Sequence, residues 1–173
     1  MAEVAESDAQ VSESQENVHR FKDCDQQALL DLVKKLGMQV RIVDSGVEIP
    51  GSFRGDDEAG LINDVLYLRA DTPVHSALHE TCHFVCMDEK RRASLHTNAG
   101  GDADEENAVC YLQILLSDAL PDMDQQKIFA DMDAWGYSFR LGSAQAWFEN
   151  DADDARHWLE SRGLLKVAEQ LVC

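Results

Sequence analysis

The chain has 173 residues, and 45% of them are hydrophobic, which is enough for one compact core but not for two domains of ordinary size. Its formal net charge of −18 repels the phosphate backbone of nucleic acids and anionic lipid headgroups. Neither nucleic acid nor a membrane is therefore expected as a partner.

The N-terminus lacks the basic region and apolar run of a secretory signal, and no stretch of about 18 apolar residues occurs in the chain. Five cysteines form an odd set without a CxxC pair, which favours reduced thiols. These features predict a soluble, cytoplasmic protein. Residues 1–20 are acidic and contain no aromatic residue, so we expect them to form a disordered tail before a single domain over residues 21–173.

The predicted elements begin with a helix from Asp25 whose leucines share one stripe and which ends near Gly37. Strands are predicted at 39–44, more weakly at 47–49, and at 65–70, where β-branched and aromatic residues lie between turn residues. A second helix is capped by Asp71 or Thr72, has Pro73 at its first position and runs to about Cys86.

A third helix is predicted at 104–119, with an inward face formed by Ala108, Tyr111, Leu112 and Leu115. Beyond Pro121 the pattern is helical to about residue 133. A loop at 135–142 and several amphipathic helical segments follow. The predicted class is α+β, with more helix than sheet.

The segment from His79 to His83 reads HExxH and lies in a predicted helix. Two histidines at positions i and i+4 project from one helix face, close enough to hold a single ion. Glu80 can lie beside such a metal and take a proton from zinc-bound water. With six histidines in the chain, shuffling its residues would produce this pattern in roughly one or two chains per hundred. A structural metal site is a stronger rival, but it usually completes its coordination with cysteine and has no use for Glu80.

Downstream, Glu105-Glu106-Asn107-Ala108 opens an apolar run that ends in Leu115-Leu116. Together with HExxH, this segment resembles the gluzincin metallopeptidases and is most similar to the small members of the ImmA/IrrE type. Val109 stands where that family tends to have asparagine, and Pro121 lies slightly later than the family's proline.

The resemblance implies a small zincin-like domain with a short mixed or antiparallel sheet, an HExxH helix, a second metal-ligand helix and a helical C-terminal part. It also implies that His79, His83 and Glu105 bind zinc and that Glu80 activates water. The strand VLYLR at 65–69 would then line the cleft and pair with a peptide along a free edge.

Glu106 is the alternative third ligand, because a shift of one residue would exchange the two glutamates. We favour Glu105, since Ala108, Leu112 and Leu115 follow it at i+3, i+7 and i+10 on the apolar face. Other possible ligands are less favoured. Glu89 would need a glycine turn that the sequence lacks, and His75 lies one helical turn too early. Buried cysteines usually serve as small apolar residues, which makes Cys82, Cys86 and Cys110 weak candidates.

An oxyanion formed during hydrolysis needs a donor opposite Glu80. The candidates are Tyr111, Tyr137, His96 and Arg140, with the two tyrosines taken as the catalytic candidates. The expected function is that of a zinc metallopeptidase acting on a peptide or protein. The alternatives are a non-catalytic, metal-stabilised binding or regulatory module and a zinc hydrolase of another amide or ester.

Overall fold

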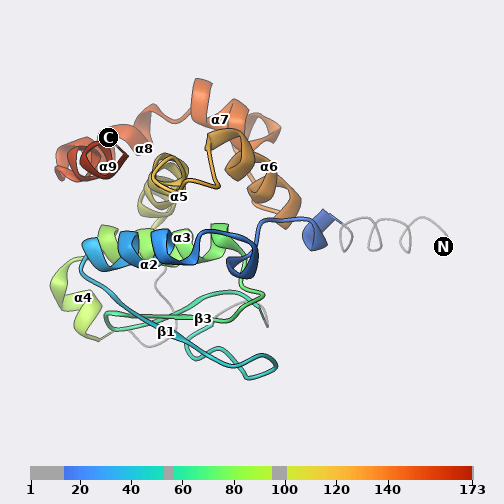
Figure 1. The fold of residues 1–173 in the computed structure, drawn as a ribbon. Coiled ribbons are helices and arrows are strands. Elements are labelled where there is room, and N and C mark those ends of the chain that lie inside the picture. The colour runs from blue at the N-terminus through green and yellow to red at the C-terminus, as the bar shows by residue number, and fades with distance from the viewer. Residues whose placement is uncertain (1–13, 53–56, 95–100, 173) are drawn as a thin grey trace, which may run out of the picture.

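The computed structural model of the chain describes residues 14–52, 57–94 and 101–172. It shows the α+β class that the sequence predicts, with a small sheet and a larger set of helices. Figure 1 shows the sheet as one layer, helices α2 (Gln26–Lys35) and α3 (Val74–Cys86) above it, and the C-terminal helices as a further layer.

The sheet contains β1 (Gln39–Ile42), β2 (Gly60–Ile62) and β3 (Val65–Leu68) in the order β1-β3-β2. β1 pairs with β3 in parallel, and β2 pairs with β3 antiparallel, so the sheet is mixed. Leu66 and Leu68 are fully buried, whereas Val65 and Tyr67 are partly exposed. This alternation is what one buried face of a sheet requires.

Two predictions about the sheet are wrong. Residues 47–49 lie in a loop, and the additional strand is β2, a three-residue segment that is too short and too glycine-rich to carry the sequence pattern of a strand. β3 is the central strand, with β1 on one side and β2 on the other. Because both of its edges are already paired, the strand at 65–68 has no free edge to offer a peptide.

The helices around the site form where the apolar spacing predicts them, but the predicted cap of α3 is wrong, because the side chains of Asp71 and Thr72 bond to Arg69 and do not cap the helix. Asp25 caps α2 by accepting a hydrogen bond from the Ala28 amide, and Gly37 follows the helix at a φ of 90°. Pro73 occupies the N-cap of α3, one position before the predicted place. Most of α3 is buried, because it lies between the sheet and α5.

Helix α5 (Ala103–Ser117) packs against α3 on one side and against α8 (Asp153–Ser161) and α9 (Leu164–Val172) on the other. The short helix α4 (Glu89–Ala93) lies between α3 and α5 in the chain. The remaining elements are η1 (Phe21–Asp23), α6 (Gln125–Trp135), η2 (Arg140–Gly142) and α7 (Ala144–Asn150). α5 is therefore the axis on which the C-terminal helices assemble (Figure 1).

Residues 14–20 contradict the predicted tail, because they pack on the domain. Ser14 Oγ and Gln15 Nε2 donate to carbonyl oxygens at the end of α6, at 3.3 and 3.1 Å. The backbone of Arg20 pairs with Pro73 in an isolated bridge, and Val18 is buried. Polar residues that indicated disorder here satisfy the carbonyl groups of a helix end. Residues 1–13 of that prediction lie outside the described residues.

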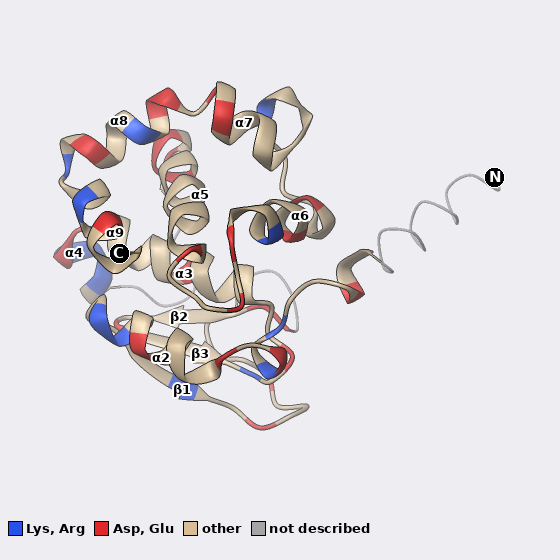
Figure 2. Cartoon of the chain, turned by 45° about the horizontal axis from the view of Figure 1, so that its top comes forward, with Lys and Arg blue, Asp and Glu red and all other residues tan. Residues whose placement is uncertain are grey.

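The acidic excess is visible on the C-terminal helices, where Asp and Glu colour parts of α7 and α8 (Figure 2). Within the described ranges, no helix has the length and apolar character to cross a bilayer. The described cysteines, Cys24, Cys82, Cys86 and Cys110, all carry free thiols.

Candidate metal centre

The two histidines of the HExxH segment face each other on α3. Their Nε2 atoms are 3.1 Å apart, and their rings are nearly perpendicular, at 86°. The side chain of His83 is 6% exposed and that of His79 is 16% exposed. The i and i+4 spacing therefore brings two imidazole nitrogens to one point at the edge of the core.

The carboxylate of Glu106 completes this group from α5. Its Oε1 lies 3.2 Å from His79 Nε2, and its Oε2 lies 3.3 Å from His83 Nε2. The Glu106 side chain is 44% exposed, so the group borders solvent. Among the described residues, His79, His83 and Glu106 are the set of ligand atoms that lie close enough together to hold one ion.

The distance between the two imidazole nitrogens is close to that between two ligands of a tetrahedral ion. Ligands held at about 2.0–2.1 Å in tetrahedral geometry are separated from each other by about 3.3 Å. Here the two Nε2 atoms are 3.1 Å apart, and each lies 3.2–3.3 Å from a different carboxylate oxygen of Glu106. Two imidazoles and one carboxylate also form the donor set of catalytic zinc sites, which keep a fourth position for water or substrate.

Glu106 takes the place predicted for Glu105, and this is a correction to the predicted site. Glu105 accepts a hydrogen bond from Arg91 Nη1 at 2.6 Å, and its side chain is 9% exposed. Successive helical residues are rotated by about 100°, so the two glutamates point to different neighbours. The apolar spacing identified Glu105 correctly as buried, but the buried side of α5 at this turn faces Arg91 rather than the histidines.

Gln113 lies two turns along α5 from Glu106 and is fully buried. His79 Nδ1 is 2.9 Å from Gln113 Oε1. Gln113 Nε2 donates to the carbonyl oxygen of His75 at 2.8 Å and to the Tyr137 hydroxyl at 3.3 Å. The sequence prediction does not include this residue. The signal for it is its i+7 spacing from Glu106, since i and i+7 share a helix face.

Tyr137, one of the two predicted catalytic tyrosines, does lie beside the histidines. Its ring centroid is 5.6 Å from that of His79, and its hydroxyl is 3.1 Å from His75 Nδ1. Burial raises the pKa of Tyr137 to about 12. The phenol therefore keeps its proton at neutral pH.

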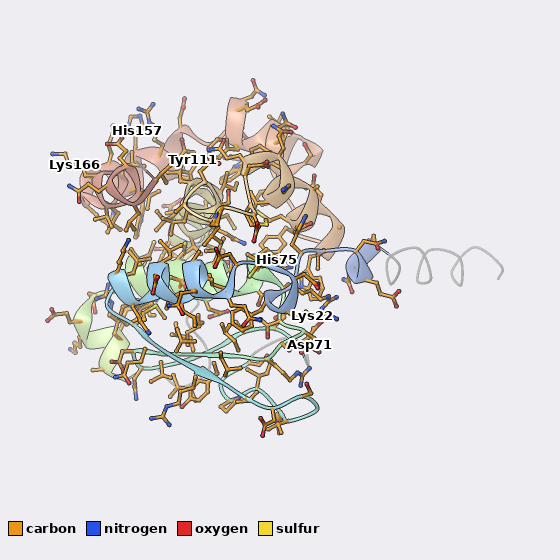
Figure 3. The ribbon with its side chains drawn as sticks, in the orientation of Figure 1. Lys22, Asp71, His75, Tyr111, His157 and Lys166 are labelled. Atoms are coloured by element: carbon orange, nitrogen blue, oxygen red, sulfur yellow. The ribbon has the colours of Figure 1, made fainter. Side chains whose placement is uncertain are left out.

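The other predicted oxyanion donors are not brought to the histidines. Tyr111 stacks on Phe148 with ring centroids 4.6 Å apart, and Figure 3 shows it among the C-terminal helices while His75 lies at the level of α3. Arg140 Nε is 2.8 Å from Asp151 Oδ2 at an exposed position. His96 lies outside the described residues. Tyr111 is therefore removed from the candidate site, because it points to α7 rather than to α3.

Glu80 follows His79 on α3 and is partly exposed, in contrast to the buried residues before and after this pair. Cys110 of α5 is among the neighbours that raise the pKa of His79. Cys82 and Cys86 are buried, and burial raises the pKa of the Cys82 thiol well above its usual value. Both are therefore neutral thiols in the core, which is consistent with the prediction that they serve as small buried residues and not as metal ligands.

The electrostatic setting differs sharply between two histidines of α3. Burial, with smaller contributions from His79 and Arg20, lowers the pKa of His75 to about 3. Burial alone would also lower the pKa of His79, but its polar neighbours, among them Tyr137, Cys110 and Glu106, raise it well above the usual value.

Comparison of the chain with family models, curated proteins and solved structures gives no match.

Proposed function

We propose that the chain is a zinc-dependent hydrolase of peptide bonds, in which His79, His83 and Glu106 hold the metal. The observation that supports it most directly is the convergence of two Nε2 atoms and one carboxylate at 3.1–3.3 Å, from helices that are separate in sequence. A glutamate directly after the first histidine adds the base that hydrolysis requires.

Bound zinc would supply a Lewis acid for the substrate carbonyl and lower the pKa of water to about 7. Glu80 is proposed to accept a proton from the attacking water and to deliver it to the leaving amine. Its place next to a ligand, on the partly exposed side of α3, suits a residue that must meet both water and substrate.

Tyr137 is the proposed donor to the oxygen of the substrate. Gln113 Nε2 donates to the Tyr137 oxygen, and His75 Nδ1 can donate to the same oxygen from 3.1 Å. With both of these donors, the hydroxyl keeps its own proton for an oxygen of the substrate. The choice of a peptide as substrate rests on the resemblance of the HExxH segment to gluzincin metallopeptidases.

The test combines zinc content with turnover of a peptide library. We expect about one zinc per wild-type chain, its loss in His79→Ala, and its retention in Glu80→Gln with turnover reduced by about 10²–10⁴-fold. Glu149→Gln, an exposed position on α7, serves as the control and should behave like wild type. Retained zinc together with a partner-binding activity that Glu80→Gln leaves intact would favour the non-catalytic module. A wild-type chain that takes up no zinc would exclude the proposed site.

A further inference from the structure

Gln113 is a fully buried amide whose carbonyl and amino groups are both engaged. It contacts α3 at two points, the His79 ring and the backbone of His75, which lie one helical turn apart. An uncharged polar side chain in such a position is stabilising only if its hydrogen bonds are made.

The directions of these hydrogen bonds follow from one fixed acceptor. The carbonyl oxygen of His75 can only accept, so the group of Gln113 that faces it at 2.8 Å must be the NH₂. The amide is planar, and this choice turns its Oε1 toward His79 Nδ1, at 2.9 Å. Because Oε1 can only accept, His79 Nδ1 must carry a hydrogen.

A neutral imidazole with hydrogen on Nδ1 has its lone pair on Nε2. His79 Nε2 is the atom that faces His83 and Glu106, at 3.1 and 3.2 Å. The backbone of α3 therefore orients the Gln113 amide, and the amide in turn selects the tautomer of His79 that can bind a cation.

We propose that Gln113 is a positioning residue for the metal centre, which holds the His79 ring in place and presents its Nε2 lone pair to the ion. This inference rests on the proposed function for the presence of the metal. The orientation of His79, and its tautomer when the ring is neutral, are properties of the metal-free protein as well. Outer hydrogen-bond partners of this kind typically change metal affinity by about 10–100-fold.

The first experiment is Gln113→Met, which keeps a long unbranched side chain but has no strong acceptor for His79. We expect zinc affinity, measured by competition with a chromophoric chelator, to fall about 10–100-fold. Ser117→Ala is the matched control. Ser117 is also fully buried on α5, but its hydroxyl donates within that helix to the Ile114 carbonyl. The control variant should keep wild-type zinc affinity.

A second readout separates positioning from a general effect on packing. The ¹⁵N resonances of the His79 ring, recorded without metal at a pH that keeps the ring neutral, should show hydrogen on Nδ1 in wild type. In Gln113→Met, the population with hydrogen on Nε2 should increase. Gln113→Glu restores an acceptor to His79, so this variant should retain the wild-type tautomer and provides the test if the methionine variant does not fold.

Unchanged zinc affinity in Gln113→Met, or an unchanged His79 tautomer in a folded variant without the acceptor, would overturn the role of Gln113. Loss of the wild-type tautomer in a folded Gln113→Glu would overturn it as well. A wild-type chain that binds no zinc would instead overturn the proposed function, and the tautomer comparison would still decide the role of Gln113.

Discussion

Glu105 and Glu106 are adjacent in sequence but have opposite surroundings. The carboxylate of Glu105 is buried against Arg91, whereas that of Glu106 is 44% exposed and lies between two imidazoles. A ligand of a hydrolytic metal must border the cavity that admits water and substrate. The partly exposed carboxylate of Glu106 meets this condition, whereas the carboxylate of Glu105 is turned inward to Arg91.

This difference predicts opposite effects of two neighbouring substitutions. Glu106→Ala should weaken zinc binding by more than about 100-fold, beyond the range for residues that only support a ligand, with little change in stability. Glu105→Gln should keep zinc binding but lower the free energy of unfolding by about 1 kcal/mol, because Arg91 is partly exposed and its pair is partly screened. Chelator competition and urea unfolding measure the two quantities. The reverse pattern would restore Glu105 as the ligand.

His75 predicts a pH dependence of stability. Its pKa is about 3 in the folded chain, mainly through burial, against about 6.5 when unfolded. Between these values the unfolded chain binds one more proton, so stability is lost as the pH falls from 6.5 toward 3. The loss from His75 alone should reach about 2 kcal/mol between pH 7.5 and pH 5.

His75→Gln removes this titration, so its free energy of unfolding should decline less steeply with acid than that of wild type. Urea unfolding at a series of pH values gives the two slopes. His157→Gln is the control, because the His157 side chain is 76% exposed and its substitution should leave the wild-type slope unchanged. Equal slopes for His75→Gln and wild type would show that His75 is not buried as a neutral ring.

At the scale of elements, two faces of α5 contact different parts of the molecule. Glu106, Cys110 and Gln113 follow one another at helical spacing and face the histidines of α3. Tyr111 lies on another face and stacks on Phe148 of α7. The same helix therefore contributes to the candidate metal site on one side and anchors the C-terminal helices on the other.

We expect Tyr111→Phe to keep wild-type zinc affinity and turnover, because the stacking ring remains and its hydroxyl has no place in the site. Tyr111→Ala should lower the free energy of unfolding by about 2 kcal/mol, because the contact with Phe148 is lost. This loss is smaller than that expected for truncation of a fully buried aromatic residue. Chemical unfolding and a peptide-cleavage assay test these outcomes together. A large loss of turnover in the folded Tyr111→Phe variant would return Tyr111 to the catalytic candidates.

For the whole molecule, the candidate metal joins two layers. His79 and His83 belong to α3, which rests on the sheet, and Glu106 belongs to α5, which carries the C-terminal helices. An ion bound between them would stabilise the folded state by mass action, because the unfolded chain does not preform the site.

At a free zinc concentration of about 100 times Kd, the stabilisation is about 2.7 kcal/mol, which corresponds to a rise in Tm of about 5–10 °C. Thermal unfolding with zinc and with excess chelator measures it. The double variant His79→Ala, His83→Ala should show no such rise, and magnesium should not replace zinc. An equal rise in that double variant would place the stabilising zinc elsewhere.

Features that depend on local chemistry were predicted from the sequence. The spans of α2, α3 and α5 follow from apolar residues at helical spacing and from capping residues such as Asp25, and the two histidines share a face because i and i+4 always do. The α+β class follows in the same way from the number and type of these segments.

Features that depend on neighbours distant in sequence needed the folded chain. Periodicity identifies which face of α5 is apolar, but a rotation of about 100° between Glu105 and Glu106 changes the partner from Arg91 to the histidines. The packing of residues 14–20 and the contacts of Gln113 likewise arise from contacts between segments that are remote in sequence. A local sequence pattern does not show which residue, distant in sequence, will contact a given side chain, because that contact forms only when the layers pack together.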